Sequence, residues 1–458
     1  MWTRPVCRKG CAGATNFGGS LPLQAGYACG PGSGDPVWRC RKGGGAPVLQ
    51  GALGYGALLA LAFALSEDRR RIPWRTVAGG LALQWGLALL LLGVPVAQQA
   101  VLLVSHGADA LQRATDEGTG FLFGYLGGGP LPFTETRPGA SFILAFKLLP
   151  LVLVISALGA LLFYWGLLQR VVGVFAGVLR WALGIDGALA LAAATHIFLG
   201  MIEAPLLVRP YLARMQRGEI FAMMTCGMAG VAGTVMVIYG TILATVVPDA
   251  LGMILVASVV STPAALAVGA LMVPFGKGDG AAAALDHPRA SGPLDALVRG
   301  TMDGVGPVVG ITTSLLVTIS LVALANMMIG ALPLPGGPWT LQGLFAMPLR
   351  PVMWLIGVPW AESGAAALLM GTKTVLNEFV AYVNMAALPP GALSAHSRLI
   401  MTFALCGFAN FGSLGILVGG FVVMMPDRRA EVVALGARSI VSGTIATCLS
   451  GAVAGVLG

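Results

Sequence analysis

Two glutamates interrupt apolar stretches of the sequence. Glu203 stands in the run Gly-Met-Ile-Glu-Ala-Pro, and Glu378 stands in the run Val-Leu-Asn-Glu-Phe. A carboxylate among apolar residues needs a partner or a ligand, because its burial without one is costly. Pairing with a cation such as Arg209 or Lys373 is one explanation. We favour contact with a ligand, because both glutamates stand beside Gly, Pro or Asn at the expected tips of helical hairpins.

A second polar group follows the second glutamate along the chain. Asn410 and Ser413 are three residues apart, so they share one face of a helix. An amide and a hydroxyl on one face suit the hydrogen bonding of a polyol. The alternative is a hydrogen bond between helices, which is frequent for these residue types in membranes. Their position after Glu378 favours a ligand.

The two glutamates belong to segments that echo each other. Each segment contains Trp-x2-Gly, then the Glu, then Cys-Gly-x-Ala. The defining positions are Trp181, Gly184, Glu203 and Cys226 in the first segment and Trp354, Gly357, Glu378 and Cys406 in the second. The Glu lies 19 or 21 residues after the Gly, and the Cys lies 23 or 28 residues after the Glu. We interpret the pair as an internal repeat.

The composition indicates a membrane protein. Of 458 residues, 57% are hydrophobic and 10% are charged, whereas soluble proteins carry about 25% charged residues. The run 148–168 contains no charge, and about 20 apolar residues suffice to cross a bilayer as a helix. The stretches lack the alternation of barrel strands, so the predicted fold class is an all-α polytopic membrane protein.

The elements that must position these residues are about eight spanning helices and two re-entrant hairpins. We predict the spanning helices at 48–66, 78–97, 141–166, 218–247, 251–274, 304–332, 398–425 and 431–457. The hairpins are predicted at 186–212 and 361–388, and interfacial amphipathic segments at 98–118 and 341–358.

These elements divide the chain into five parts. The predicted parts are an N-terminal extension at 1–47, N-terminal helices with an interfacial helix at 48–140, a first repeat at 141–275, a polar loop at 276–303 and a second repeat at 304–458. The extension is either disordered or the product of a start assigned too early. Its cysteines (Cys7, Cys11, Cys29 and Cys40) have only one short spacing, so we expect neither a zinc site nor a disulfide framework.

The charges orient the chain. The loop 66–75 carries four arginines, which places it in the cytoplasm. Counting spans from this loop, the first hairpin enters from inside and the second from outside, so the repeat is inverted. Inverted repeats with broken helices meeting near the midplane are typical of secondary transporters. The net charge of +8 lies in the extension and in loops, so a nucleic-acid partner is not implied.

An enzyme is the competing class. It would need an acidic magnesium cluster, an activated nucleophile or a histidine-rich metal site. The four histidines (His106, His196, His287 and His396) are remote from one another, and no acidic residues cluster. We therefore expect no catalytic residue, no metal and no cofactor.

Four ordered motifs resemble the concentrative nucleoside transporter family. They are Gly200-x-x-Glu203-Ala-Pro205, Cys226-Gly-Met-Ala-x-Val-Ala-Gly233, Asn377-Glu-Phe-Val-Ala-Tyr382 and Cys406-Gly-Phe-Ala-Asn410-x-x-Ser413. The resemblance covers residues 50–458. It implies a homotrimer in a bacterial inner membrane that imports nucleosides by symport. Each subunit would have a scaffold and a mobile transport domain that moves like an elevator.

The resemblance also assigns a substrate site. Glu378, Asn410 and Ser413 would bind the ribose hydroxyls, and Phe408 matches a binding-site aromatic. On the base side Glu203 and Val235 are retained. Met201 and Ile202, however, stand where base-reading relatives carry Gln-Thr. The base pocket is therefore expected to be more apolar.

The implied ion site differs from that of sodium-coupled relatives. These relatives have an Asn at the position of His196, a Ser at the position of Gly230, and backbone carbonyls at Leu199 and Val231. Both side-chain oxygens are missing here, and a hard cation requires oxygen ligands. We therefore favour proton over sodium coupling, through His196 or Glu203. A packing role for His196 is equally compatible with the sequence.

Three alternatives stay open. They are a sodium-coupled or substrate-altered family member, a nucleoside-binding membrane protein that does not transport, and an integral-membrane enzyme.

Overall fold

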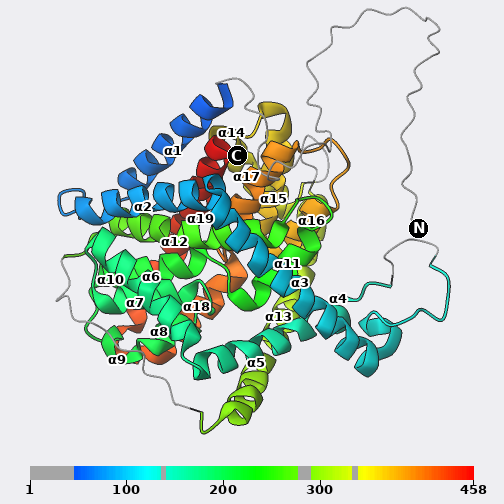
Figure 1. Cartoon of the computed structure of the whole chain (residues 1–458). Helices are drawn as coiled ribbons and strands as arrows, with labels where there is room; N and C mark the ends of the chain where they lie inside the picture. Colours follow the sequence, from blue (N-terminus) through cyan, green and yellow to red (C-terminus); the bar gives the residue numbers. More distant parts are fainter. Residues whose placement is uncertain (1–45, 136–140, 277–289, 333–338) are drawn as a thin grey trace, which may run out of the picture. The chain divides into compact units, whose positions relative to one another are not determined.

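The computed structural model describes residues 46–135, 141–276, 290–332 and 339–458, and every regular element in these ranges is helical (Figure 1). The predicted all-α fold class is confirmed. Within these ranges, six helical stretches are long and apolar enough to cross a membrane. The predicted count of eight includes shorter helices and stays a prediction. Apart from Ala46 and Pro47, the extension at 1–47 lies outside the described residues, as do residues 277–289 of the polar loop predicted at 276–303.

The N-terminal part and the start of the first repeat together contain five α-helices and a 3₁₀ turn. They are α1 (Ala46–Ala64), α2 (Trp74–Gly93), α3 (Pro95–Phe123), η1 (Gly124–Gly127), α4 (Leu144–Lys147) and α5 (Pro150–Tyr164). The amphipathic segment 98–118 is helical and belongs to the longer α3. The predicted helix 141–166 is a short α4 followed by α5, which begins at Pro150, where the missing N–H costs no helix bond.

The first repeat contains α6 (Leu167–Leu183), which the sequence analysis missed. It continues with α7 (Gly187–His196), α8 (Glu203–Leu207), α9 (Arg209–Leu212), α10 (Arg217–Ala229), α11 (Gly233–Leu243) and α12 (Ala250–Met272). α6 is amphipathic, with Val172, Leu179 and Leu183 buried. Its mixture of Arg, Gln and apolar residues is too polar for a spanning helix, which is why a search for apolar runs passed over it.

The second repeat follows the same order. Its helices are α13 (Pro293–Gly330), α14 (Leu341–Leu355), α15 (Trp360–Val375), α16 (Glu378–Ala386), α17 (Ala395–Leu405), α18 (Phe411–Met424), η2 (Pro426–Arg428) and α19 (Arg429–Leu457). α13 begins eleven residues before the predicted 304.

Two predicted continuous helices are broken. The predicted helix 218–247 divides into α10 and α11 at residues 230–232, and 398–425 divides into α17 and α18 at residues 406–410. Gly230 has extended dihedrals (φ −119°, ψ 174°) and ends α10. Such breaks persist among apolar helices only where other groups satisfy the freed backbone, so the breaks mark places where polar partners gather.

Two glycines support the equivalence of the repeats. Gly184 ends α6 with φ 66°, and Gly357 follows α14 with φ 113°. These are the glycines of the two Trp-x2-Gly motifs, and both occupy the positive-φ region that favours glycine. The matched motifs therefore form matched turns, each leading into the first helix of a hairpin.

The two breaks pack against each other at the centre of the repeats. A Cβ atom added to Gly407 would lie 2.8 Å from the Met228 carbonyl oxygen and 3.0 Å from the carbonyl carbon of Ala229. Only glycine permits this approach of α17–α18 to the end of α10. In the most apolar windows of α10–α11, α12 and the α19 stretch, 78–89% of the residues are buried.

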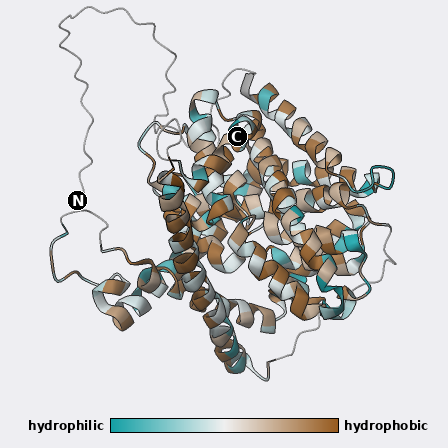
Figure 2. Cartoon of the chain, turned by 180° about the vertical axis from the view of Figure 1, so that it is seen from behind, coloured by the Kyte–Doolittle hydropathy of each residue, from teal (hydrophilic) through white to brown (hydrophobic). Residues whose placement is uncertain are grey.

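α5 and α13 pack mainly on each other. A Cβ atom on Gly300 or Gly304 of α13 would collide with α5, at 2.4 Å from Ala160 Cβ or 3.0 Å from Ser156 Cβ. This small-xxx-small pattern is typical of close helix packing in membranes. Only 11% of the apolar window of α13 is buried. Apolar residues predominate along the helices in Figure 2, and hydrophilic ones gather toward helix ends and turns.

Candidate functional site

Glu378 is a buried carboxylate at the first position of α16. Only 4% of the surface of this residue is exposed to solvent. The preceding Asn377 is the N-cap of the helix and accepts a hydrogen bond from the Val380 N–H at 3.0 Å. The positive end of a helix dipole stabilises an anion in the first turn. The local sequence Asn-Glu thus starts the helix and places the carboxylate where α16 favours it.

Each carboxylate oxygen of Glu378 has a hydrogen-bond donor. The Tyr239 hydroxyl donates to Oε1 at 2.7 Å, and the Asn410 amide Nδ2 donates to Oε2 at 2.9 Å. Asn410 is 1% exposed and is itself the N-cap of α18, where its Oδ1 accepts from the Ser413 N–H at 2.7 Å. The cap fixes which end of the amide faces Glu378. Glu378, Asn410 and Ser413, predicted as one group, are thus brought together.

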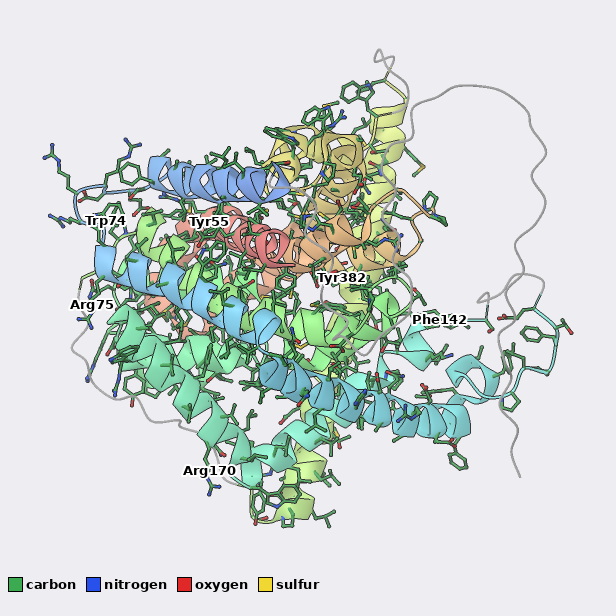
Figure 3. The ribbon with its side chains drawn as sticks, turned by 45° about the horizontal axis from the view of Figure 1, so that its top comes forward. Tyr55, Trp74, Arg75, Phe142, Arg170 and Tyr382 are labelled. Atoms are coloured by element: carbon green, nitrogen blue, oxygen red, sulfur yellow. The ribbon has the colours of Figure 1, made fainter. Side chains whose placement is uncertain are left out.

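Tyr239 is a member of this group that the sequence analysis missed. It lies on α11 of the first repeat, one turn after the predicted Val235, and both residues are buried. Its ring packs 5.2 Å from the ring of Tyr382, which lies in the interior of the second repeat (Figure 3). A single tyrosine four residues after a named site residue, on an otherwise apolar helix, was the available signal.

Lys373 does not pair with Glu378. Its ammonium donates to the Ala404 carbonyl at 2.9 Å and to the Thr447 hydroxyl at 3.2 Å. None of the ion pairs in the described ranges involves Glu203 or Glu378. The alternative that hairpin cations merely neutralise the two glutamates therefore has no support from the geometry.

The remaining predicted residue of the second repeat, Phe408, lies in the break between α17 and α18. It is half-buried, and its carbonyl accepts from the Asn410 N–H at 2.8 Å. The aromatic ring thus belongs to the same short segment that presents the Asn410 amide.

The tip of the first hairpin lies farther along α18. The Ile202 side chain contacts Gly420, since a Cβ atom there would be 2.1 Å from Ile202 Cδ1. Gly420 is seven residues beyond Ser413, or about 10 Å along the helix. Met201 is buried against Gly227. Ile202 therefore packs on α18 beyond Ser413, and Met201 packs on α10.

Glu203 is exposed and does not join the Glu378 group. Its carboxylate turns back toward Gly200, where an added Cβ atom would lie 2.1 Å from Oε2. The structure therefore separates the two repeat-related glutamates, one buried and bonded, the other open.

His196 lies at the end of α7, against the break between α10 and α11. It is 3% exposed, and an added Cβ atom on Gly230 would be 3.1 Å from its Nε2. The ring lies beside the backbone of Gly200 and Cys226, but neither ring nitrogen reaches a partner with hydrogen-bond geometry in the described part of the chain. An imidazole that fills the space beside a glycine, with both nitrogens unpaired, is able to accept a proton or a bound water.

The other predicted ion-site residues lie on the two backbone segments that meet beside the His196 ring. Val231 is fully buried and Leu199 half-buried, and the Gly233 N–H donates to the Phe198 carbonyl at 3.2 Å. This bond ties the tip of the first hairpin to the start of α11. Within the described ranges, no three His, Cys, Asp or Glu side chains are grouped to hold a metal ion.

Two cavities lie near the first hairpin. A cavity of about 10 Å³ is lined by His196, Met201, Cys226 and their neighbours and has room for about one water. An open cavity of about 460 Å³ separates α9 from the turn between α18 and α19. Its lining includes Arg209, Asp427 and Arg428. Neither cavity is lined by Glu378, Asn410 or Ser413.

Comparisons with family profiles cover most of the chain. Residues 53–126 and 253–455 match the N-terminal and C-terminal parts of the profile described as "Na+ dependent nucleoside transporter". Residues 145–246 match a profile described as "Nucleoside recognition".

Individual relatives agree with the profiles over nearly the whole described body. A transporter of Haemophilus influenzae without an assigned substrate is 37% identical, covering 89% of this chain and 97% of its own length. The nucleoside permease NupC of Helicobacter pylori is 30% identical, with coverages of 89% and 97%. The solved structure of CNTnw in an inward-facing, substrate-bound state superposes with a TM-score of 0.81 at 37% identity, covering 90% of this chain and 98% of that one.

Proposed function

This chain belongs to the concentrative nucleoside transporter family and is a multi-pass membrane transporter rather than an enzyme, and from this premise we propose that it imports nucleosides by proton-coupled symport. Glu378, Asn410 and Ser413 bind the ribose, with Phe408 beside them. Val235, Met201, Ile202 and Glu203 face the base.

The observation that carries this proposal is the bonded pair of Glu378 and Asn410. A carboxylate has about four acceptor positions and a primary amide has two N–H donors. Tyr239 and Asn410 use one acceptor position on each oxygen of Glu378, and Glu378 uses one N–H of Asn410. What is left over is an anionic acceptor next to a neutral donor. A sugar hydroxyl, which donates and accepts, matches that combination.

The base end of the site is apolar. Ile202 lies about 10 Å along α18 from Ser413, a span comparable with the length of a nucleoside. Neither Ile202 nor Met201 offers a side-chain hydrogen bond to a base, and an apolar pocket discriminates weakly between isosteric groups. We therefore propose that the sugar is read by hydrogen bonds and that several bases are accepted.

Uptake into proteoliposomes tests this assignment. Labelled uridine or adenosine is expected to enter, and nucleosides but not free bases are expected to compete. Glu378→Gln places an N–H opposite the Tyr239 hydroxyl or the Asn410 amide, so uptake should fall about 100-fold. Glu362→Gln is the matched control, because Glu362 lies on the same hairpin but bonds Ser394 at the surface. Nucleoside binding without any uptake would instead identify a non-transporting relative.

Proton coupling is supported by the surroundings of His196. The buried ring lies beside the Gly200 and Cys226 backbone at the carboxyl end of α10, where the helix dipole favours a cation. A protonated imidazole would itself be the cation at this site, so no oxygen ligand at the position of Gly230 would be needed. An imposed inward proton gradient is expected to drive uptake, and a sodium gradient at constant pH is not. Accumulation driven by sodium alone would overturn the coupling assignment.

A pair of histidine variants separates the coupling role from packing. His196→Gln keeps polarity but does not titrate, so uptake should lose its dependence on the proton gradient while nucleoside exchange persists. His106→Gln, on the exposed face of α3, is the control. Retention of gradient-driven uptake by His196→Gln would shift the relay to Glu203.

The assembly is also part of the proposal. The paired helices α5 and α13, with their large exposed apolar surface, are proposed as scaffold in a homotrimer of the bacterial inner membrane. The two hairpins and the broken helices are proposed as the moving transport domain. A mass measurement in lipid nanodiscs that gave only monomers would remove the trimer.

A further inference from the structure

Lys373 is a fully buried lysine that the transport scheme above does not use. It lies in the last turn of α15 and is 0% exposed. A lysine inside an apolar membrane segment is rare and marks a functional contact or a compensating partner. No acidic side chain among the described residues forms an ion pair with it, so its charge is compensated in another way.

The compensation comes from the carboxyl end of a half-helix. α17 ends at Leu405, immediately before the break. The last four carbonyls of a helix have no partner within it, and together they carry about half a negative charge. The ammonium of Lys373 donates to one of these carbonyls, that of Ala404, at 2.9 Å. Its second bond reaches the Thr447 hydroxyl of α19 at 3.2 Å.

Other bonds complete this helix end. The Tyr382 hydroxyl donates to the Thr402 carbonyl at 2.9 Å, and the Cys406 N–H donates to the Phe403 carbonyl at 3.1 Å. Three of the last four carbonyls of α17 are thus satisfied, two of them by side chains of the second hairpin. The hairpin therefore satisfies the carboxyl end of α17 and compensates its negative partial charge.

The corresponding end of α10 in the first repeat is different. α10 ends at Ala229, and among the described residues no side chain reaches its last four carbonyls with good hydrogen-bond distance and angle, although the His196 ring lies beside the Cys226 backbone. The hairpin residue that approaches is His196, whose ring nitrogens stay unpaired. Each hairpin therefore sends one basic side chain to the carboxyl end of the half-helix that follows it. Only the lysine makes hydrogen bonds there.

We propose that Lys373 is a tethered cation: its ammonium permanently supplies, at the break of the second repeat, the positive charge that a free monovalent cation would otherwise have to bring. Ion coupling is thereby confined to the first repeat. The part concerning the first repeat rests on the proposed function above, whereas the role of Lys373 at the end of α17 stands on its own contacts. Lys373 is a positioning residue, because it fixes α17–α18 and hence Asn410 rather than touching the sugar.

Chemical rescue tests the charge directly. Lys373→Ala leaves a space at the Ala404 carbonyl that a small alkylammonium ion fits. Nucleoside exchange across proteoliposomes at equal pH is the readout, because added amines would dissipate a proton gradient. We expect Lys373→Ala to lower exchange about tenfold or more, and ethylammonium to restore a large part of it. The neutral analogue of the same size, ethanol, should restore none.

Lys373→Met separates charge from packing. Methionine keeps most of the side-chain volume but has neither a charge nor a donor, so it should be as impaired as Lys373→Ala. Exchange at the wild-type rate by Lys373→Met would overturn the proposal. Lys147→Ala, which removes a lysine on α4 that lies over the Phe142 ring, should respond to neither additive.

A folding readout covers the case in which the variant is unstable. If Lys373→Ala aggregates, recovery of monodisperse protein in ethylammonium, and not in ethanol, supports the tethered cation. Equal behaviour in both additives overturns it. This readout needs no nucleoside, so it remains decisive even if the wild-type protein transports none. Absence of wild-type nucleoside transport would count against the proposed function alone.

Discussion

The two repeats differ in how many of the helix ends near their breaks carry a side-chain hydrogen bond. At the second break, Asn377 and Asn410 cap α16 and α18, and Lys373 and Tyr382 bond the end of α17. At the first break, Ile202 and Ala232 hold the corresponding cap positions of α8 and α11, and neither makes a side-chain cap.

In the second repeat the polar groups are therefore already held in place, whereas in the first repeat they are not. A site whose donors and acceptors are already fixed loses little conformational freedom on binding. A break without side-chain caps gains most from an added proton, ion or water. This difference fits our proposal that the second repeat reads the substrate and that the first responds to a coupling ion.

Among the variants that test this difference, Asn410→Ala should have the largest effect. This change removes the Nδ2 bond to Glu378 and the cap on the Ser413 N–H. A bond to a charged group contributes about 1.5–3 kcal/mol and a cap about 1 kcal/mol. The combined loss should reduce nucleoside uptake on the order of 100-fold, measured as initial rate at low substrate concentration.

Asn377→Ala is the graded control for this prediction. It removes only the cap on the Val380 N–H, about 1 kcal/mol, and should reduce uptake about fivefold. Equal losses in the two variants would mean that the Asn410–Glu378 bond has no special weight.

Tyr239→Phe should have the next largest effect. It deletes the hydroxyl that donates to Glu378 Oε1 and preserves the ring contact with Tyr382. The carboxylate then has a free acceptor in a buried site, so the apparent KM for nucleosides should rise about tenfold. Tyr382→Phe is the control, since its hydroxyl bonds the Thr402 carbonyl and it should lower stability more than affinity. An unchanged KM for Tyr239→Phe would remove this residue from the site.

The double variant His196→Asn/Gly230→Ser should sharpen the comparison by completing the first break. It installs two side-chain oxygens where the imidazole now fills the space beside Gly230, and oxygen ligands suit a hard cation. Uptake is expected to become several-fold stimulated by sodium and to lose its response to a proton gradient. Gly230→Ser alone should only disturb packing, because its Cβ atom would meet Nε2 at 3.1 Å. A folded double variant that ignores sodium would argue against the first break as the ion site.

The smallest effects are expected at the matched turns. Gly184→Ala and Gly357→Ala force a Cβ atom into positive φ, which costs roughly 1–2 kcal/mol. Thermal unfolding should occur a few degrees lower in both, with nucleoside affinity unchanged. Gly56→Ala, at a helical position with open space, should not destabilise. A turn variant that alters affinity without altering stability would contradict the purely structural role of these glycines.

Much of the fold follows from residue order alone. Apolar length predicts the helices, and the spacing of Trp, Gly, Glu and Cys predicts two related hairpins. The breaks at 230–232 and 406–410 escaped prediction, because a long apolar run looks continuous when its backbone partners come from elsewhere. α6 escaped for the opposite reason, since its polar residues hide a helix that buries only one face.

The site residues were predictable where a polar side chain interrupts an apolar segment. Glu378, Asn410 and Ser413 are recognisable in the sequence as polar residues within apolar segments. The bond from Tyr239 joins residues 139 positions apart, and that between Lys373 and Thr447 joins residues 74 apart. Such pairs depend on how the two repeats cross, which no local spacing encodes.

The position of Lys373 on the same hairpin as Glu378 has an electrical consequence. Moving one elementary charge through a potential of 100 mV changes its energy by about 2.3 kcal/mol. With Glu378 ionised, the two opposite charges are five residues apart and travel together. Their electrical work therefore nearly cancels, and the membrane potential neither drives nor resists a displacement of the empty hairpin through this pair. In the proposed scheme, any voltage dependence then comes from charges outside this pair.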